Sequence, residues 1–582
     1  MSHQMWWRTI SSQFVLTNRG AIRMTRISPR RVLQRLHGIA RPPLTITPPP
    51  DGVLAEWNCA ITARDGITLR ANVFRPEPNS AGDLVHPDGR FPVIMCAHPY
   101  DKDVLPRKVP WGYLPPLPYR VFRQPEPITF SAWTGWEGPD PAYWVRLGFA
   151  VVVGDLRGFG SSDGIGTMLS KQEGEDYHDL IEWAGTQPWS NGRVGLLGVS
   201  YLALSQYRAA AERPPHLAAI CPWEGWSDLY RDFAKPGGVS EMGFFKLWST
   251  TVSKRGRVTE DLLAEATARP EFDAWWQSRM PKIEDIEVPM LVCGSFSDHL
   301  LHTRGSFEAF RRVKSDQKWL YTHRGGKWCT FYGAEAQGVQ RRFFERFLCD
   351  ADNGWDDEPP VRIAIHETGE RPLEIRSATT WPPPDIVWTG LHLQRDGTLS
   401  DQPESHEQSS SYANADGSLS YRWTVPQSID LIGPMTLHLD VSLEGVEDTT
   451  MLAAIRLLRD GREVTFEGSY GFAGDVVTHG WLRPAHRTLD QGLSTDWQPV
   501  HSHAVREPLS AGEIVPVSIA LLPQATHLRA GDVLELELRS HWLFPVNPFS
   551  GQMPARYVTK ESGSTRIHLG GGHRAELRIP IA

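Results

Sequence analysis

The sequence predicts an α/β domain with a mostly parallel sheet, followed by a C-terminal all-β domain. Three observations support this fold class. The chain has 582 residues, too many for a single hydrophobic core. Short apolar runs alternate with amphipathic stretches over the first 350 residues or so, as in strand–helix repeats. Beyond residue 356 the pattern changes to short strands of alternating apolar and polar residues, separated by Gly, Asp and Pro turns.

The chain begins with a segment of unusual charge. Residues 1–50 hold eight Arg, no Lys and no acidic residue, and they end in the proline-rich "RPPLTITPPP". We interpret this segment as a flexible extension or an overlong start. Its composition also fits an organelle-targeting peptide. Six scattered cysteines without metal-binding spacing predict reduced thiols and a cytoplasmic protein, with organelle targeting as the alternative.

The elements of the α/β domain follow in order. Residues 52–80 predict strands with a turn at Asp65-Gly66. An amphipathic helix is expected in "DYHDLIEWAGTQPW" (176–189). The buried strands are expected in "FPVIMCAHP" (91–99), "WVRLGFAVVVGDLRG" (144–158), "GRVGLLGVS" (192–200), "LAAICPW" (217–223), "PMLVCGSFSD" (289–298) and "QKWLYTH" (317–323).

Residues 226–284 interrupt this pattern with helical segments rich in Trp and Phe. An insertion between late strands of such a sheet usually covers its active edge, so we predict a helical cap. The C-terminal part, 356–582, predicts a β-sandwich or jelly roll. The expected domains are therefore an extension over 1–50, an α/β domain over 51–225 and 285–355, the cap, and the β domain.

The stretch "GLLGVSYLALS" (195–205) places a serine between a strand and a helix. Such a turn exposes the hydroxyl of Ser200 and needs small neighbours, which Gly198 and Ala203 supply. Backbone N–H groups at the helix start, notably that of Tyr201, point toward a developing oxyanion. The alternative role for Ser200 is a helix N-cap.

A nucleophilic serine needs a base and an orienting carboxylate, which follow the serine in the chain order of α/β-hydrolases. Asp298 and His323 follow two later strands and fit that order. Other candidates are His299 and His302, which share the segment of Asp298, and the acids Asp155 and Asp228. The loop "HPYDKD" (98–103) offers the Tyr100 hydroxyl as an oxyanion donor.

These motifs together resemble the family of serine hydrolases that contains cocaine esterase, X-prolyl dipeptidyl-peptidases and α-amino-acid ester hydrolases. The matching segments are "HPYDKD", "VVVGDLRGFGSSDG", "NGRVGLLGVSYLALSQ", "CPWEGWSDLYRDF" and "LRAGDVLELELRSHWLFPVNP". The resemblance implies an α/β-hydrolase fold with a helical cap and a jelly roll. It also implies Ser200, Asp298 and His323 as the catalytic triad, with Tyr100 and Tyr201 in the oxyanion hole.

We therefore predict an acyl-enzyme-forming serine hydrolase that acts on a small-molecule ester or amide. An esterase is the first choice, and an X-Pro dipeptidyl aminopeptidase, an acyltransferase or a non-catalytic binding protein on the same scaffold are alternatives. Residues Trp223, Glu224, Trp226 and Asp228 are candidates for substrate binding. The net charge of −8 and the lack of an 18-residue apolar run argue against nucleic-acid and membrane partners. No cofactor or metal is expected, and a homodimer is one option for the oligomeric state.

Overall fold

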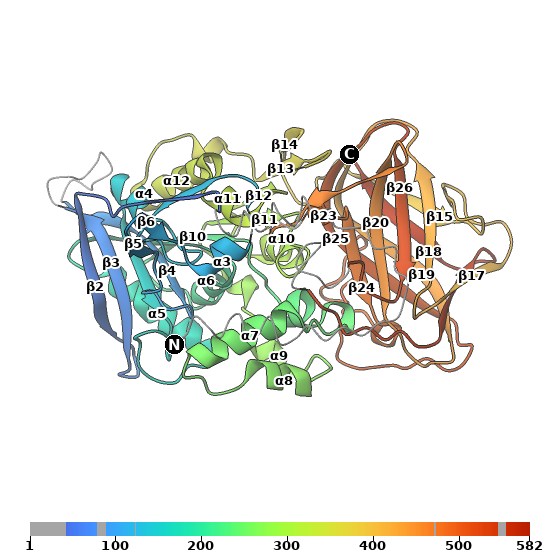
Figure 1. Cartoon of the computed structure of the whole chain (residues 1–582), viewed down its shortest axis with the longest axis horizontal. Helices are drawn as coiled ribbons and strands as arrows, with labels where there is room; N and C mark the ends of the chain where they lie inside the picture. The colour runs from blue at the N-terminus through green and yellow to red at the C-terminus, as the bar shows by residue number, and fades with distance from the viewer. Residues whose placement is uncertain (1–41, 78–88, 123, 370, 471–472, 545–554) are drawn as a thin grey trace.

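The structure is a computed structural model that describes residues 42–77, 89–122, 124–369, 371–470, 473–544 and 555–582. It contains an α/β domain and a β domain, which lie side by side along the long axis of the molecule (Figure 1). Most of the N-terminal extension, residues 1–41, lies outside the described residues. Within them, no helix is both long enough and apolar enough to cross a membrane.

The α/β domain contains a ten-stranded sheet in the order β14-β13-β12-β11-β10-β9-β4-β8-β3-β2. Its strands from β8 to β13 run parallel, and β2, β3 and β14 are antiparallel to their neighbours. The bounds are β2 Val53–Thr62, β3 Thr68–Pro76, β4 Phe91–His98, β8 Ala150–Asp155, β9 Ser190–Val199, β10 Leu217–Trp223, β11 Met290–Ser295, β12 Lys318–His323, β13 Val361–Ile365 and β14 Glu374–Ala378. The predicted strands of this domain are thus confirmed.

Helices cover both faces of this sheet, as the continuous apolar strands predict. On one face α5 (Lys171–Gly185) and α6 (Tyr201–Ala211) pack on each other and on β9. On the other face α12 (Ala334–Cys349) packs on β9 and β10, while α4 (Pro141–Arg146) packs on β8. Every residue of β4 and β8 is buried as a result.

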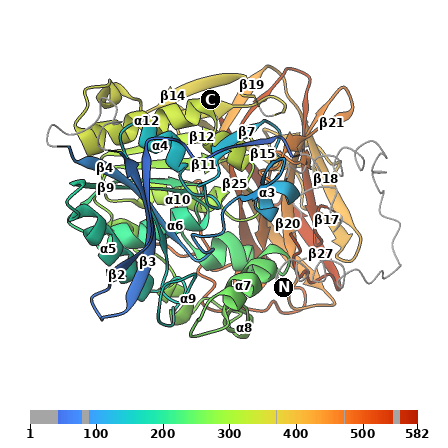
Figure 2. The same cartoon turned by 60° about the vertical axis from the view of Figure 1, so that its left-hand side comes forward.

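The predicted cap consists of short helices inserted between β10 and β11. They are η1 Leu229–Ala234, η2 Pro236–Gly238, α7 Phe244–Arg255, α8 Leu262–Ala268, α9 Ala274–Ser278 and η3 Ile283–Asp285. Figure 2 shows α7, α8 and α9 together beside the sheet. A second insertion follows β4. It contains β5 Arg107–Val109, β6 Gly112–Leu114, α3 Leu117–Val121 and β7 Ile128–Ser131.

The β domain contains a seven-stranded and a five-stranded sheet, which confirms the predicted β-sandwich architecture. Apolar residues from both sheets form a second hydrophobic core. The strands of the two sheets are β15 Val387–Leu393, β16 Leu399–Ser400, β17 Gln408–Ala413, β18 Ser418–Thr424, β19 Ile429–Glu444, β20 Met451–Arg459, β21 Arg462–Val464, β24 Thr478–Leu482, β25 Val515–Leu528, β26 Val533–Arg539, β27 Ser564–Leu569 and β28 Ala575–Ile581. Two short strands, β22 Phe466–Glu467 and β23 Ala473–Asp475, pair with each other next to this sandwich.

The structure shifts two expected domain boundaries. Residues expected to belong to the N-terminal linker form β1 (Leu44–Thr47), which pairs in parallel with β7. At the other end, β13 and β14 lie beyond residue 355 but belong to the first sheet. These three strands are short and gain their stability from pairing with the domain, which composition does not reveal.

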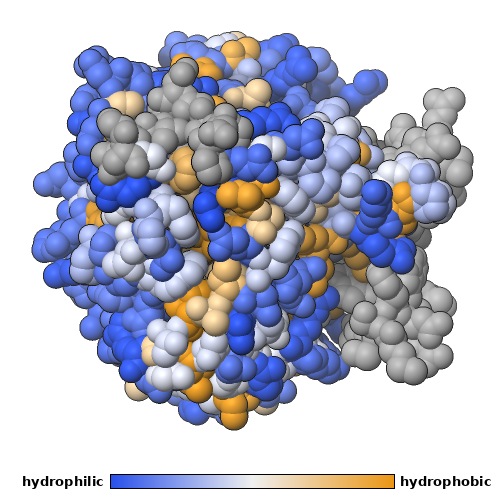
Figure 3. Space-filling view, turned by 90° about the vertical axis from the view of Figure 1, so that its left-hand side faces the viewer, coloured by the Kyte–Doolittle hydropathy of each residue, from blue (hydrophilic) through white to orange (hydrophobic). Residues whose placement is uncertain are grey.

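The end of the molecule formed by the α/β domain presents a mainly hydrophilic surface (Figure 3). Hydrophobic residues form small groups between hydrophilic ones on this face. Scattered apolar residues are normal on a monomer surface.

The second core generates the first prediction. Leu437 of β19 is fully buried in it. Replacing Leu437 by Ala leaves a cavity and should lower the free energy of unfolding of the β domain by about 2–5 kcal/mol. Urea denaturation followed by tryptophan fluorescence measures this change. Ser420→Ala, at an exposed position of β18, is the control and should leave the transition unchanged. Equal behaviour of the two variants would contradict the assigned core.

Candidate active site

Ser200 lies on the sharp turn between β9 and α6. Its backbone angles are φ 62° and ψ −116°, a conformation that L-residues rarely adopt. The Ser200 N–H donates to the carbonyl of Trp223 over 3.0 Å, which ties the turn to the end of β10. A Cβ atom on Gly198 would overlap the side chain of Leu202, so this position requires glycine. The strained turn holds the hydroxyl at the carboxyl edge of the sheet.

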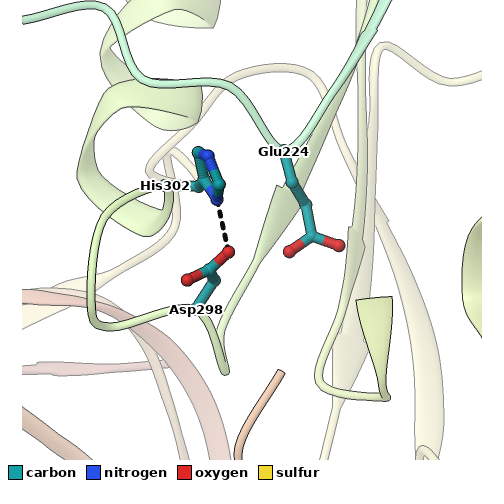
Figure 4. A group of neighbouring side chains, drawn as sticks. All are labelled: Glu224, Asp298 and His302. Atoms are coloured by element: carbon teal, nitrogen blue, oxygen red, sulfur yellow. Dashed lines mark hydrogen bonds and ion pairs between the residues drawn. The ribbon is translucent and has the colours of Figure 1, made fainter. Parts of the chain in front are cut away.

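His302 is the histidine that meets this serine. Its Nε2 lies 3.2 Å from Ser200 Oγ, and its Nδ1 lies 2.5 Å from Asp298 Oδ2. Both His302 and Asp298 are fully buried. Figure 4 shows their side chains facing each other, with Glu224 beside them on the neighbouring strand end. Ser200, His302 and Asp298 form a serine–histidine–carboxylate chain of the kind that activates a serine.

A single turn of backbone brings Asp298 and His302 together. The Asp298 carbonyl accepts N–H groups from Leu301, His302 and Thr303, at the start of α10 (Thr303–Arg312). Residues four apart on such a turn lie on the same side, so the carboxylate reaches the imidazole. The Trp226 ring stacks on His302 at an interplanar angle of 16° and holds its orientation.

His323, the histidine that the sequence favoured, has other partners. Its Nε2 lies 3.1 Å from Glu224 Oε1, and its Nδ1 accepts the N–H of Gly325 over 3.2 Å. Because Nδ1 is an acceptor here, the proton resides on Nε2 and is donated to Glu224. No hydrogen bond joins His323 to Ser200 among the described residues, so the structure places His302 next to the serine hydroxyl, where the sequence predicted His323.

The signal for His302 was present in the sequence. "DHLLH" (298–302) places a histidine four residues after the acid, which is helical spacing. Because His302 shares a segment with Asp298, strand context alone favours His323, which ends a separate strand. In the structure, the helical turn between Asp298 and His302 is what brings the carboxylate to the imidazole.

Lys327, at the first position of α11 (Lys327–Phe331), also points into this cluster. Its Nζ lies 2.5 Å from Asp298 Oδ2, 2.8 Å from His302 Nδ1 and 3.9 Å from Glu224 Oε2. Glu224, Asp298 and His302 could together offer ligand atoms to a metal ion. The lysine ammonium already supplies the cation at these carboxylates, so the residues do not fit a metal.

The charges of the cluster set its protonation state. Burial favours the neutral Asp298 carboxyl, but the Lys327 charge and the interaction with His302 outweigh it and hold the pKa of Asp298 well below its usual range. Burial and the Lys327 charge lower the pKa of His302, although Asp298 opposes them. His302 is therefore neutral near pH 7 and free to accept a proton. Burial raises the pKa of nearby Glu137 to about 8.

The predicted oxyanion donors lie beside the serine turn. The Tyr100 hydroxyl accepts a hydrogen bond from Trp248 Nε1 over 3.2 Å, which leaves its own hydrogen to donate. Tyr201 is the first residue of α6, and helix geometry leaves such an N–H without an i−4 partner. Its hydroxyl donates to the buried Glu173 over 2.7 Å and anchors the turn.

The four residues predicted to bind substrate have different surroundings. Trp226 covers His302, and Glu224 holds His323 and accepts from Ser469 Oγ. The fully buried Trp223 packs against Tyr321 and His323. Asp228 caps η1 and forms an ion pair with Arg231 at 2.7 Å, so its carboxylate is committed to the cap.

Cavity size does not single out this site. A cavity of about 1100 Å³ lies between α5, α6 and the end of the cap, and no triad residue lines it. The assignment of the site therefore rests on the geometry of Ser200, His302 and Asp298.

Comparisons with known proteins agree with this architecture. The model of the X-Pro dipeptidyl-peptidase (S15 family) matches residues 65–326, and the model of the X-Pro dipeptidyl-peptidase C-terminal non-catalytic domain matches residues 353–578. Cocaine esterase from Rhodococcus sp. (strain MB1 Bresler) is 23% identical in an alignment that covers 90% of this chain and 98% of the esterase.

Solved structures extend the comparison. A CocE/NonD family hydrolase from Staphylococcus aureus is 35% identical, with a TM-score of 0.84 over 91% of this chain and 94% of that one. An α-amino acid ester hydrolase shares the fold at 17% identity, with a TM-score of 0.65 over 91% of this chain and 97% of that one.

The turn at Ser200 generates the second prediction. Gly198→Ala forces its new methyl group against Leu202 and displaces Ser200, so kcat should fall at least about tenfold, as small misplacements of a reacting group do. Hydrolysis of a short-chain nitrophenyl ester measures the effect. Gly338→Ala in α12 is the matched control, because nothing lies within 4 Å of its added methyl. A fully active Gly198→Ala enzyme would refute the tight turn.

Proposed function

Because the chain belongs to the CocE/NonD family of hydrolases, which are serine esterases and peptidases, we propose that it cleaves an ester through an acyl-enzyme on Ser200. The observation that carries this proposal is the pair of contacts made by His302. Its Nε2 faces the Ser200 hydroxyl and its Nδ1 faces the Asp298 carboxylate.

In the acylation step, His302 Nε2 takes the Ser200 proton while Oγ forms a bond to the substrate carbonyl carbon. The carbonyl oxygen becomes an oxyanion that the Tyr100 hydroxyl and the Tyr201 N–H stabilise. The imidazolium then returns its proton to the leaving alcohol as the ester C–O bond breaks. Asp298 keeps the Nδ1 proton in place and stabilises the transient positive charge.

In the deacylation step, water attacks the acyl carbon and loses a proton to His302. The second oxyanion collapses, the bond to Ser200 Oγ breaks, and His302 reprotonates the serine. Each turnover therefore consumes one water and releases one carboxylic acid and one alcohol. The cap rings around the site, including Trp226 and Trp248, support an apolar acyl or alcohol group in the substrate.

The surroundings of Glu224 favour an ester over an X-Pro peptide. An aminopeptidase of that type needs an anionic group for the substrate's α-ammonium. Glu224 is the acid closest to this role, but its oxygens accept from His323 and Ser469, and Lys327 Nζ lies 3.9 Å away. Asp228 is held by Arg231. Both carboxylates already have hydrogen-bonding or charged partners in the protein, which leaves neither to bind a substrate ammonium. We therefore favour ester hydrolysis over cleavage after X-Pro.

The assignment of the base gives the third prediction. His302→Gln should lower kcat/KM for a nitrophenyl ester by at least about 10³-fold. Ser200→Ala should cause a similar loss, because the base and the nucleophile act as one unit. His323→Gln is the matched control and should lose only a few-fold, because His323 contacts Glu224 and not the serine. Labelling by a fluorophosphonate probe should disappear in Ser200→Ala and slow in His302→Gln.

A large loss of activity in His323→Gln with only a small loss in His302→Gln would identify His323 as the base. Retention of esterase activity and labelling in Ser200→Ala would overturn the proposed function itself. Parallel assays with Ala-Pro-nitroanilide test the peptidase alternative, which gains support if this substrate is turned over faster than the ester.

Tyr100 gives the fourth prediction. Tyr100→Phe removes one oxyanion donor but keeps the ring, so kcat should fall by about 10²–10³-fold with little change in KM. Steady-state kinetics with the same ester measure both constants. Tyr113→Phe, on strand β6, serves as the control tyrosine. An unchanged kcat in Tyr100→Phe would exclude its hydroxyl from the oxyanion hole.

A further inference from the structure

Lys327 is a fully buried lysine that the hydrolytic steps above do not use. Its side chain extends from α11 to the Asp298–His302 pair. There it lies near His302 Nδ1, whereas Ser200 lies near His302 Nε2. The ammonium has Asp298 at 2.5 Å, the Tyr470 hydroxyl at 3.3 Å and the face of the Tyr470 ring at 4.8 Å. A buried charge is retained only where it has such partners.

The groups that face this lysine are mostly acidic. Asp298 lies at the end of β11, Glu224 at the end of β10, and Glu137 in the loop before α4; all three are buried carboxyls. The charges of Asp298 and Glu224 favour the protonated lysine, and Glu137 adds to them when it is ionised. Together these charges outweigh the effect of burial and raise the pKa of Lys327. Lys327 is therefore the cation that balances the buried carboxylates of the active site.

The donor and acceptor capacities of the groups, with His302 in the tautomer that a general base requires, define what the lysine does. His302 Nδ1 carries the proton that it donates to Asp298, so Nδ1 cannot accept another. The ammonium 2.8 Å from Nδ1 must therefore donate to Asp298 Oδ2. One carboxylate oxygen thus receives both donors, and its orientation toward His302 is defined from two sides.

We propose that Lys327 is a positioning residue of the triad, which fixes Asp298 against His302 and opposes the protonation of His302. This inference rests on the proposed function, because it assigns Lys327 to the same hydrolytic site. A positive charge this close to the imidazole disfavours the imidazolium, whereas the Asp298 carboxylate favours it. The lysine offsets the carboxylate, so the base stays neutral and active at lower pH.

The sign of the pH effect follows from these charges. The charged groups around His302 are Asp298, Glu224 and Lys327. Removing Lys327 leaves the two carboxylates unopposed, and the pKa of His302 rises. Because catalysis needs the neutral imidazole, the acid limb of the profile of kcat/KM against pH moves to higher pH.

The test compares Lys327→Met with the wild type between pH 5 and pH 9.5. We expect the acid limb to move up by about one unit, so that kcat/KM falls about tenfold more at low pH than at high pH. Lys327→Arg keeps the charge and should keep the limb near its original position. Lys235→Met is the matched control, because this buried lysine binds Ser240 in the cap.

A loss of activity by the same factor at every pH, in a folded Lys327→Met enzyme, would show a merely structural role and overturn the inference. If Lys327→Met does not fold, the double variant Lys327→Met with Glu224→Gln removes a buried charge of each sign. Compared with the Glu224→Gln single variant, which lacks the same carboxylate, it should show an upward shift of the limb, because the two differ only in Lys327. An unshifted limb in that comparison overturns the inference.

The two proposals fail in different ways. An active His302→Gln enzyme defeats the triad and the role of Lys327 together. An inactive His302→Gln enzyme beside a Lys327→Met enzyme with the wild-type pH profile defeats only the role of Lys327.

Discussion

The structure of this site depends on the shared carboxyl edge of a parallel sheet. Strands β9, β10, β11 and β12 are neighbours and end together, so the residues that follow them converge. Ser200 follows β9, Glu224 follows β10, Asp298 follows β11, and His323 ends β12. The side chains at this edge are buried, which makes each polar group dependent on a partner. The chain of contacts from Ser200 to His302, Asp298 and Lys327 satisfies that requirement.

The β domain contributes to the same site, although it holds none of the triad. The segment between β22 and β23 places Ser469 and Tyr470 against the hydrolase domain. Ser469 donates to Glu224, its carbonyl accepts the N–H of Lys327, and Tyr470 covers the Lys327 ammonium. The second domain thus closes one side of the charged cluster. This arrangement gives a physical reason for the two domains to stay joined in one chain.

The elements that could be predicted were those with strong local patterns. The strands of "FPVIMCAHP" and "PMLVCGSFSD", and the serine turn at Gly198 and Ser200, were all identified from apolar runs and small residues. Short strands at the domain boundaries, such as β1 and β14, were missed because their stability comes from pairing. Asp228 was predicted near the substrate because it follows a strand end, but a neighbouring arginine holds it in the cap.

The sequence by itself determined the sheet, the place of Ser200 and the acid Asp298, because strand periodicity and strand ends are local properties. Only the tertiary structure decided which histidine meets the serine. His302 and His323 both follow Asp298, and chain order cannot separate them. The choice depends on a helical turn that aims His302 at Ser200, and on Gly325 and Glu224, which occupy both nitrogens of His323. Tertiary packing decides which side chains come within hydrogen-bond distance of each other. The spacing of residues along the sequence does not contain this information.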